Sequence, residues 1–265
     1  MIPQKSTDNR TLVQQQFGSN AGAYATSTVH AKGASLGRLV ELVQPQTEWR
    51  ALDIATGAGH TAFAFAPHVA HITASDLTLE MLTVAENLAK EKRLENVDFK
   101  EADAENMPFD NATFDLVTCR IAPHHFPDIH QFLQECARVL KPGGVLAIVD
   151  NIVPEDQPAA EFVNAFEKFR DPSHGRCLSA EEWADSYQQS EIKLTHAEEA
   201  KKAMDFEAWC NNMNVSPEGR ATLRGMLRGA PTFAQVFLSP EFTEGGRITF
   251  YLSEGIFIGR SNKNG

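Results

Sequence analysis

The chain of 265 residues has few cysteines, a deficit of positive charge and no long apolar segment. Its four cysteines, Cys119, Cys136, Cys177 and Cys210, form no C-x-x-C pair, which predicts reduced thiols and neither a disulfide framework nor a zinc site. Lys and Arg number 24 against 35 Asp and Glu, a net charge of −11, which argues against nucleic-acid binding. No apolar run approaches the roughly 20 residues of a membrane span, and the polar start lacks a signal-peptide pattern. We therefore expect a cytoplasmic protein without a membrane span.

One segment has the pattern of a nucleotide-binding turn. Residues 51–60 read A-L-D-I-A-T-G-A-G-H: an apolar run ends in Asp53, breaks at Gly57 and Gly59, and leads into a helix-compatible segment over 61–66. A strand, a glycine turn and a helix N-terminus in this order commonly bind a nucleotide-like cofactor. The spacing also fits G-x-G-x-x-A, so an NAD-dependent oxidoreductase is one interpretation.

The charge at this turn distinguishes two possible cofactors. A pyrophosphate on the turn requires backbone N–H groups and no nearby carboxylate. Asp53 lies directly before the turn, and no Lys or Arg occurs between Asp53 and Lys90. S-Adenosylmethionine (SAM) carries an ammonium, a sulfonium and no phosphate, so a carboxylate suits it. Asp76 lies about twenty residues after the turn, where an acid binds ribose hydroxyls, which both cofactors have. The turn thus favours SAM over NAD.

Helices and strands alternate along the first part of the chain. The expected helices cover 35–43, 61–66, 79–92 and 129–140. Besides the strand ending at Asp53, the expected strands cover 69–75, 97–100, 114–119 and 145–149. This order predicts an α/β fold with a parallel, doubly wound sheet.

The pattern changes after residue 150, and further helices with two more strands follow. We expect four parts: an N-terminal helical lid, a cofactor-binding core, a helical cap that includes a returning strand near 191–203, and a C-terminal strand. Their expected ranges are 1–34, 35–155, 156–245 and 246–265, respectively. The inserted helices are expected over the carboxyl edge of the sheet, where ligands bind in this architecture.

Five motifs follow one another along the chain: L-D-I-A-T-G-A-G-H at 52–60, A-S-D-L-T-L-E-M-L at 74–82, D-A-E-N-M-P-F at 103–109, F-D-L-V-T-C-R at 114–120 and R-V-L-K-P-G-G at 138–144. In this order and spacing they resemble the class I SAM-dependent methyltransferases, in the branch of the ubiquinone/menaquinone-type (UbiE-like) enzymes. R-I-A-P-H-H-F-P-D at 120–128 and R-D-P-S-H-G-R at 170–176 resemble a narrower, YcgJ-like bacterial subgroup. The resemblance implies a Rossmann-like, mostly parallel seven-stranded sheet with a helical cap. It also implies methyl transfer from SAM, with S-adenosylhomocysteine (SAH) as product.

The resemblance also implies which residues bind the cofactor. The turn would hold its methionine end, Asp76 the ribose, and Asp103 the adenine amino group. The expected cofactor-binding residues are Asp53, Ala55, Thr56, Gly57, Gly59, Asp76, Leu77, Met81, Asp103, Ala104, Arg120 and Ile121. Structural alternatives are helix caps for Asp53 and Asp76, a turn role for Asp103, and core packing for Leu77 and Met81. Ala55 replaces a glycine usual in the family, which is tolerable if its φ is negative.

For methyl transfer itself, the protein mainly has to align the acceptor and the methyl carbon at about 3–3.5 Å. A base is needed only when the acceptor must lose a proton. The catalytic candidates are His124 and His125, just past the fourth strand, and Asp150 at the end of the fifth. Each has a structural alternative, in packing or in satisfying backbone N–H groups. His130 adds a third imidazole, but without a carboxylate pattern we expect no metal site.

Substrate contacts are expected from two segments. Tyr24 and His30 lie in the expected lid, for which packing of a terminal helix is the alternative. Arg170, His174 and Arg176 would contact an anionic or hydroxylated acceptor, with a solvated, salt-bridged loop as the alternative.

An N/D-P-P-Y motif, often used on amino groups of bases or proteins, is absent, and residues 120–125 occupy its place. This absence and the acidic charge favour a small-molecule acceptor. We expect a SAM-dependent methyltransferase that acts by C- or O-methylation of an aromatic or quinol-like compound. The alternatives are N-methylation of a small amine and a SAM-binding protein that no longer methylates. The oligomeric state is left open.

Overall fold

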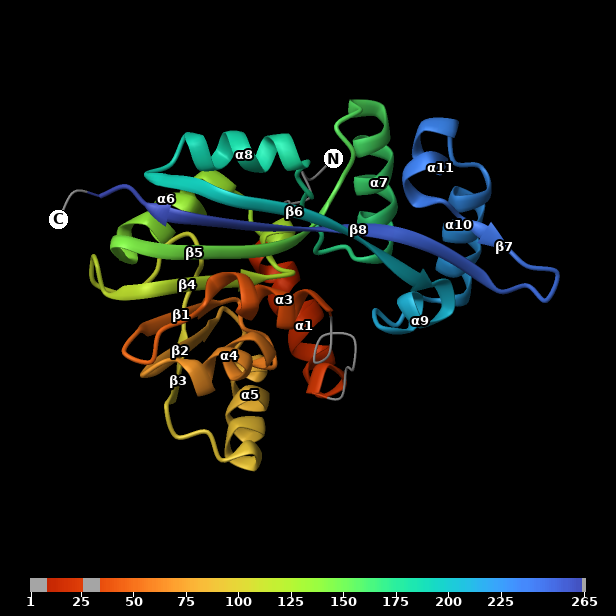
Figure 1. The fold of residues 1–265 in the computed structure, drawn as a ribbon. Helices are drawn as coiled ribbons and strands as arrows, with labels where there is room; N and C mark the ends of the chain where they lie inside the picture. Colours follow the sequence, from red (N-terminus) through yellow and green to blue (C-terminus); the bar gives the residue numbers. More distant parts are fainter. Residues whose placement is uncertain (1–8, 26–33, 264–265) are drawn as a thin grey trace, which may run out of the picture.

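The computed structural model describes residues 9–25 and 34–263 of the chain, and the side chains of residues 9–18 and 35–263 (Figure 1). Within these residues, one mixed sheet of eight strands has the order β3-β2-β1-β4-β5-β8-β6, with β7 paired to β8. The strands are β1 (Arg50–Ile54), β2 (His71–Asp76), β3 (Val97–Glu101), β4 (Phe114–Arg120), β5 (Leu140–Ile152), β6 (Ile192–Asp205), β7 (Glu241–Phe242) and β8 (Ile248–Ser261). Strands β1 to β5 are parallel, whereas β8 is antiparallel to both β5 and β6. The predicted doubly wound, mostly parallel α/β fold is confirmed.

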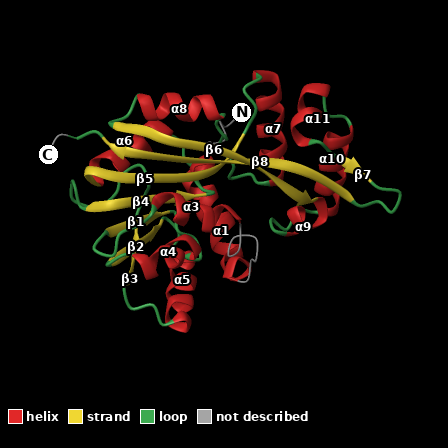
Figure 2. Ribbon diagram, viewed as in Figure 1, coloured by secondary structure: helices red, strands yellow, loops and turns green. Residues whose placement is uncertain are grey.

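Helices cover both faces of the sheet and one end of it (Figure 2). They are α1 (Asn9–Ala25), α3 (Ala34–Val43), α4 (His60–Phe65), α5 (Leu79–Lys92), α6 (Ile129–Val139), α7 (Gln157–Arg170), α8 (Ala180–Gln188), α9 (Phe206–Asn211), α10 (Pro217–Arg228) and α11 (Thr232–Leu238), with 3-10 turns η1 (Ala66–His68) and η2 (Pro123–His125). Side-chain caps fix several helix starts. Asp128 Oδ1 accepts from Gln131 N at the start of α6, and Ser179 and Glu182 form a capping box at α8.

Of the parallel strands, β1, β2, β4 and the second half of β5 are largely buried on both faces, whereas the edge strand β3 is partly exposed. Neighbouring residues of β4 illustrate this arrangement. Leu116 packs in the cluster formed with α3, α4 and α5, whereas Val117 packs in the cluster formed with α6 and α8. The sheet therefore separates two apolar layers and leaves its carboxyl edge for a binding site.

The antiparallel pair β6 and β8 continues past the rest of the sheet. β5 pairs with β8 over residues 253–260, but β6 pairs with β8 as far as Asp205 and Thr249. A third apolar cluster, which includes Phe166, Trp209 and Phe250, joins this extension to α7, α9 and α10 (Figure 1). The extension thereby brings the helical region to the carboxyl edge of the sheet.

Candidate functional site

The carboxyl ends of β1, β2, β4 and β5 open into one cavity, which α1, α9 and the extension of β6 and β8 complete. The expected cofactor-binding residues that line it are Ala55, Thr56, Gly57, Asp76, Leu77, Met81, Asp103, Ala104, Arg120 and Ile121. Asp53 and Gly59 do not line it, and they support the turn from behind. His124, His125 and Arg170 also line the cavity, whereas Asp150, His174 and Arg176 do not. Tyr24 belongs to α1, but its side chain lies outside the described residues, as does all of His30.

The turn after β1 has a left-handed backbone at three positions: Ala55 (φ 51°), Gly57 (φ 56°) and Gly59 (φ 86°). The condition under which alanine would be tolerable here, a negative φ, is therefore not met, and the Cβ of Ala55 costs about 1 kcal/mol in this conformation. Hydrogen bonds hold the turn in place, because Thr56 N donates to Ser75 O at 2.8 Å and Gly59 N to Thr56 O at 2.9 Å. A Cβ on Gly59 would lie 2.3 Å from Cζ of Phe63, so this position requires glycine.

Ile121 is a second strained position in the cavity wall. Its φ is 54°, a region that β-branched residues rarely adopt. Its backbone N–H donates to Val149 O at 2.7 Å, which holds the residue at the end of β4. Strain of this kind is concentrated at functional sites in proteins.

Asp53 lies beneath the turn and not in the cavity wall. Its carboxylate accepts hydrogen bonds from the hydroxyls of Thr56 (2.6 Å) and Thr118 (2.7 Å). Burial raises its pKa to about 6, against the opposing effect of these two hydrogen bonds. Asp53 therefore connects β1, the turn and β4.

Asp76 is exposed to the cavity at the end of β2. Its Oδ2 accepts from Gly57 N at 2.8 Å and its Oδ1 from Thr78 N at 2.9 Å. Burial raises the pKa of this carboxyl, while the backbone hydrogen bonds oppose that shift. Since Gly57 belongs to the turn after β1, Asp76 joins the turn to the start of α5.

Helix α1 belongs to the segment expected to form an N-terminal lid, and it covers one end of the cavity. Arg10 Nε lies 2.8 Å from Asp103 Oδ2, and its guanidinium also pairs with Glu105. Gln14 Nε2 donates to Leu77 O at 3.0 Å, and Phe17 lines the cavity beside His125. The α1 sequence has no strong apolar face, so no periodicity in the sequence indicates this docking.

His124 and Asp150 form a buried, hydrogen-bonded pair. Asp150 Oδ1 lies 2.6 Å from His124 Nδ1, and Asp150 Oδ2 accepts from the His124 backbone N at 2.8 Å. Burial opposes a charge on the imidazole, but the Asp150 carboxylate, with smaller effects from Glu167 and Asp171, raises the pKa of His124. The pair joins η2 to the end of β5.

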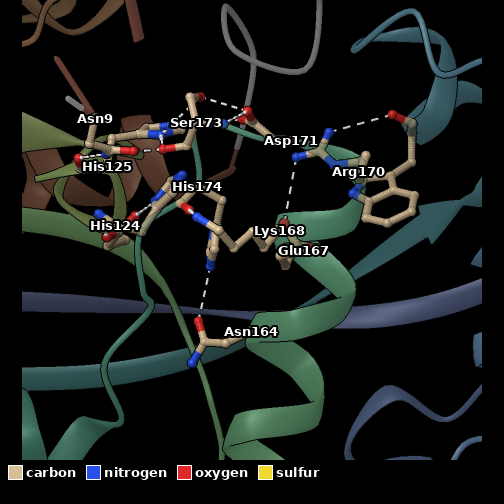
Figure 3. Close-up of polar contacts among 12 residues, drawn as sticks. Asn9, His124, His125, Asn164, Glu167, Lys168, Arg170, Asp171, Ser173 and His174 are labelled. Atoms are coloured by element: carbon tan, nitrogen blue, oxygen red, sulfur yellow. Dashed lines mark hydrogen bonds and ion pairs between the residues drawn. The ribbon is translucent and has the colours of Figure 1, made fainter. Parts of the chain in front are cut away.

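The two segments that resemble the narrower subgroup contact each other (Figure 3). His124 O accepts hydrogen bonds from Gly175 N (2.8 Å) and Arg176 N (3.0 Å). The His125 Nδ1 atom lies 3.0 Å from Ser173 O, and the His124 and His174 rings lie 5.3 Å apart. The loop after α7 therefore packs directly on η2.

His174 and Arg176 are directed away from the cavity. His174 Nε2 lies 3.0 Å from Asn164 Oδ1, and Arg176 pairs with Glu182 at the surface. Of the three residues expected from this loop, Arg170 is the one that lines the cavity. In Figure 3 Arg170 lies on the other side of Asp171 from the histidines.

The wall around Arg170 contains polar atoms without hydrogen-bond partners. The Arg170 guanidinium lies 4.6 Å above the Trp209 ring, and its contacts with Glu167 Oε2 and Trp209 O are both long, at 3.5 Å. Arg170 Nε, Trp209 Nε1 and Asn151 Oδ1 are buried with no partner among the described residues. Lys202 lines the same wall and pairs with Glu254 at 2.7 Å. Met204, Met213 and Leu252 supply the apolar part of the wall.

Two negative findings apply to the described residues. They contain no group of three or more His, Cys, Asp or Glu side chains that is arranged to hold a metal ion. Across the same part of the chain, no helix has the length and apolar character needed to cross a membrane.

Comparison with known proteins identifies a family of similar chains. Residues 52–148 match the family model described as "Methyltransferase domain". YcgJ of Bacillus subtilis (strain 168), described as an uncharacterized methyltransferase, is 40% identical over 193 residues, which cover 73% of this chain and 76% of YcgJ. The crystal structure of YcgJ has a TM-score of 0.84 at 34% identity, covering 87% of this chain and 99% of that one. The demethylmenaquinone methyltransferase of Chlorobaculum tepidum is 36% identical over 115 residues, 43% of this chain and 46% of that enzyme.

Proposed function

Because the chain belongs to the SAM-dependent methyltransferases of class I, with YcgJ as a relative, we propose that it methylates a planar, oxygen-bearing small molecule at carbon or oxygen. One observation carries this proposal: a single cavity contains both the glycine turn and a second wall with unused hydrogen-bond donors. The name of the demethylmenaquinone methyltransferase supports a quinol-like acceptor for a relative, and we extend that class to this chain.

The residues at the sheet edge fit SAM. The turn from Ala55 to Gly59 contains no basic side chain. Its backbone is fixed by hydrogen bonds from Gly57 N to Asp76 and from Thr56 N to Ser75 O. We propose that the turn and Arg120-Ile121 hold the methionine end. Asp76 would hold the ribose, with Leu77 and Met81 beside the adenine. Asp103 and Ala104 would bind the adenine amino edge. Bound SAM supplies an activated methyl group whose leaving thioether needs no proton.

The second wall fits an uncharged acceptor oxygen better than an anion. Arg170 and Lys202 are each accompanied by a carboxylate, Glu167 and Glu254, so the wall carries little net positive charge. The donors Arg170 Nε and Trp209 Nε1 nevertheless have no partner. An unpaired buried donor costs about 1–3 kcal/mol, and a carbonyl or hydroxyl oxygen would remove this cost after a small side-chain adjustment. A protonated amine accepts no hydrogen bond and would leave these donors unpaired, so N-methylation ranks second.

Two measurements test the proposal. A thermal-shift titration with SAM, SAH, NAD and NADP should show stabilisation by SAM and SAH alone, by about 2.7 kcal/mol at 100 times the dissociation constant. Labelled SAM is then incubated with phenols, quinols and small amines, and we expect methylated products from the phenols or quinols. Turnover of amines alone would replace the proposed acceptor class. SAM binding without turnover across the panel would favour the catalytically silent alternative.

A further inference from the structure

We propose that the His124–Asp150 pair is the general base that takes a proton from the acceptor, held in place by the loop of residues 171–176. This proposal rests on the proposed methylation of an oxygen-bearing acceptor, because a neutral amine needs no base before it attacks. It adds a specific proton acceptor to a reaction that otherwise requires only alignment.

The hydrogen bonds between the two residues fix the imidazole tautomer. Asp150 is buried, and its two oxygens contact the His124 backbone N–H and Nδ1 at 2.8 and 2.6 Å. A carboxylate only accepts hydrogen bonds, so Nδ1 carries the proton in this contact. The lone pair of a neutral His124 is then on Nε2. No described residue forms a hydrogen bond with Nε2, and the side chain lines the cavity.

The neighbouring histidines are held in a different way. His125 directs Nδ1 to Ser173 O, and its Nε2 lies 4.0 Å from Asp171 Oδ2. Burial and the charge of His124 lower the pKa of His125, and the same causes lower that of His174. Among these three rings, His124 is therefore the one with a directly bonded carboxylate. The charged groups around it are Asp150 from β5, Glu167 from α7, and Asp171 from the following loop.

The loop after α7 leaves η2 little freedom to move. Gly175 N and Arg176 N both donate to His124 O, and a Cβ on Gly175 would lie 2.9 Å from that oxygen. Asn9 Nδ2 of α1 bridges the two segments by donating to His125 O (2.6 Å) and Ser173 O (3.2 Å). Figure 3 shows the contacts of Asn9 with His125 and Ser173. Positioning residues thus surround the backbone of His124, while the residue itself lines the cavity.

The proton and the electrons of this step balance. The acceptor O–H bond breaks, its proton bonds to His124 Nε2, and the electron pair left on oxygen forms the new bond to the methyl carbon. SAM supplies that methyl group and leaves as neutral SAH, with the electrons of the C–S bond on sulfur. The imidazolium then releases the proton to water, and Asp150 stabilises its charge in the meantime.

The first test is the protonation of His124 in the SAH-saturated protein, measured by NMR with ¹⁵N-labelled histidine and assigned with His124→Gln. We expect neutral His124 to carry its proton on Nδ1 and to have a lower pKa in Asp150→Asn. A proton on Nε2 of the neutral ring, or a pKa that Asp150→Asn leaves unchanged, would overturn the proposal. This result does not depend on knowing the acceptor.

The second test compares 4-nitrophenol, ionised at the assay pH, with 4-methylphenol, which keeps its proton. In His124→Gln we expect kcat with 4-methylphenol to fall by about 100-fold or more, in the usual range for a lost general base. The rate with 4-nitrophenol and the affinity for SAH should change little. The control is His130→Gln, because His130 is an exposed histidine on α6.

The possible outcomes distinguish failure of the proposed general base from failure of the proposed reaction class. Equal loss with both phenols would indicate a structural role and overturn the proposal. If wild-type protein binds SAM but methylates neither phenol nor any quinol, the proposed function fails, while the NMR measurement still decides the state of the His124–Asp150 pair.

Discussion

Arg10 Nε lies 2.8 Å from Asp103 Oδ2, although the two residues are 93 positions apart in the sequence. This ion pair joins α1 to the loop after β3 at the end of the cavity that we assign to the adenine. The same guanidinium pairs with Glu105, whose side chain is buried. Helix α1 thus closes the cavity through a charge contact with a residue that we expect to bind the cofactor.

Loss of this ion pair should accelerate cofactor release. In Arg10→Gln we expect SAH to dissociate on the order of threefold to fivefold faster, in line with about 1 kcal/mol for a partly exposed ion pair. Stopped-flow displacement of SAH measures this rate. Arg38→Gln is the matched control, because Arg38 pairs with Glu198 outside the cavity. Unchanged or slower release in Arg10→Gln would show that α1 does not retain the cofactor.

Asp53 should make stability depend on pH. Burial raises its pKa from 3.8 to about 6, so its contribution to stability is full below pH 3.8 and is lost as the pH rises through 6. The loss amounts to up to about 3 kcal/mol. Asp53→Asn has no such titration, so its free energy of unfolding relative to wild type should increase from pH 4 to pH 7. Urea unfolding at several pH values measures this difference, and a constant difference would contradict the prediction.

Relief of the left-handed backbone at Ala55 should stabilise the fold. We expect Ala55→Gly to raise the free energy of unfolding by about 0.5–1 kcal/mol, since the strain removed exceeds the added flexibility of the unfolded chain. Ala58→Gly is the control in the same turn, because Ala58 is buried and its φ is not positive. It should be destabilising. If both variants lose stability equally, the backbone strain at Ala55 does not lower the free energy of unfolding.

Removal of the indole N–H at Trp209 should weaken acceptor binding alone. For Trp209→Phe we expect KM for the most active phenol or quinol to rise about threefold to tenfold, the usual range for one hydrogen bond. Affinity for SAH should stay the same. Trp183→Phe is a close control, because Trp183 Nε1 is also buried without a partner but lies outside the cavity lining. Equal effects of the two variants would argue against a contact between Trp209 and the acceptor.

Local patterns in the sequence predicted the elements and the cofactor end of the cavity. Alternating strands and helices specify the sheet, and the motif resemblance, confirmed by the similarity to YcgJ, gives its carboxyl-edge residues. The positive φ of Ala55 could not be predicted from the sequence, because the hydrogen bond from Thr56 N to Ser75 O, a contact between distant segments, fixes the turn. Contacts of Arg10, Asn9 and Trp209 depend on tertiary packing, which no periodicity encodes.

The position of β8 between β5 and β6 has a consequence for the order in which this protein is assembled during synthesis. This strand, residues 248–261, lies between β5 and β6 and forms the ladder that attaches both β6 and the helical region to the sheet. Until those residues leave the ribosome, the outer edge of β5 has no neighbour, and unpaired strand edges are prone to aggregate. From the synthesis of residue 152 until that of residue 261, the nascent chain therefore carries an open apolar edge, and chaperone binding would be most useful in that interval.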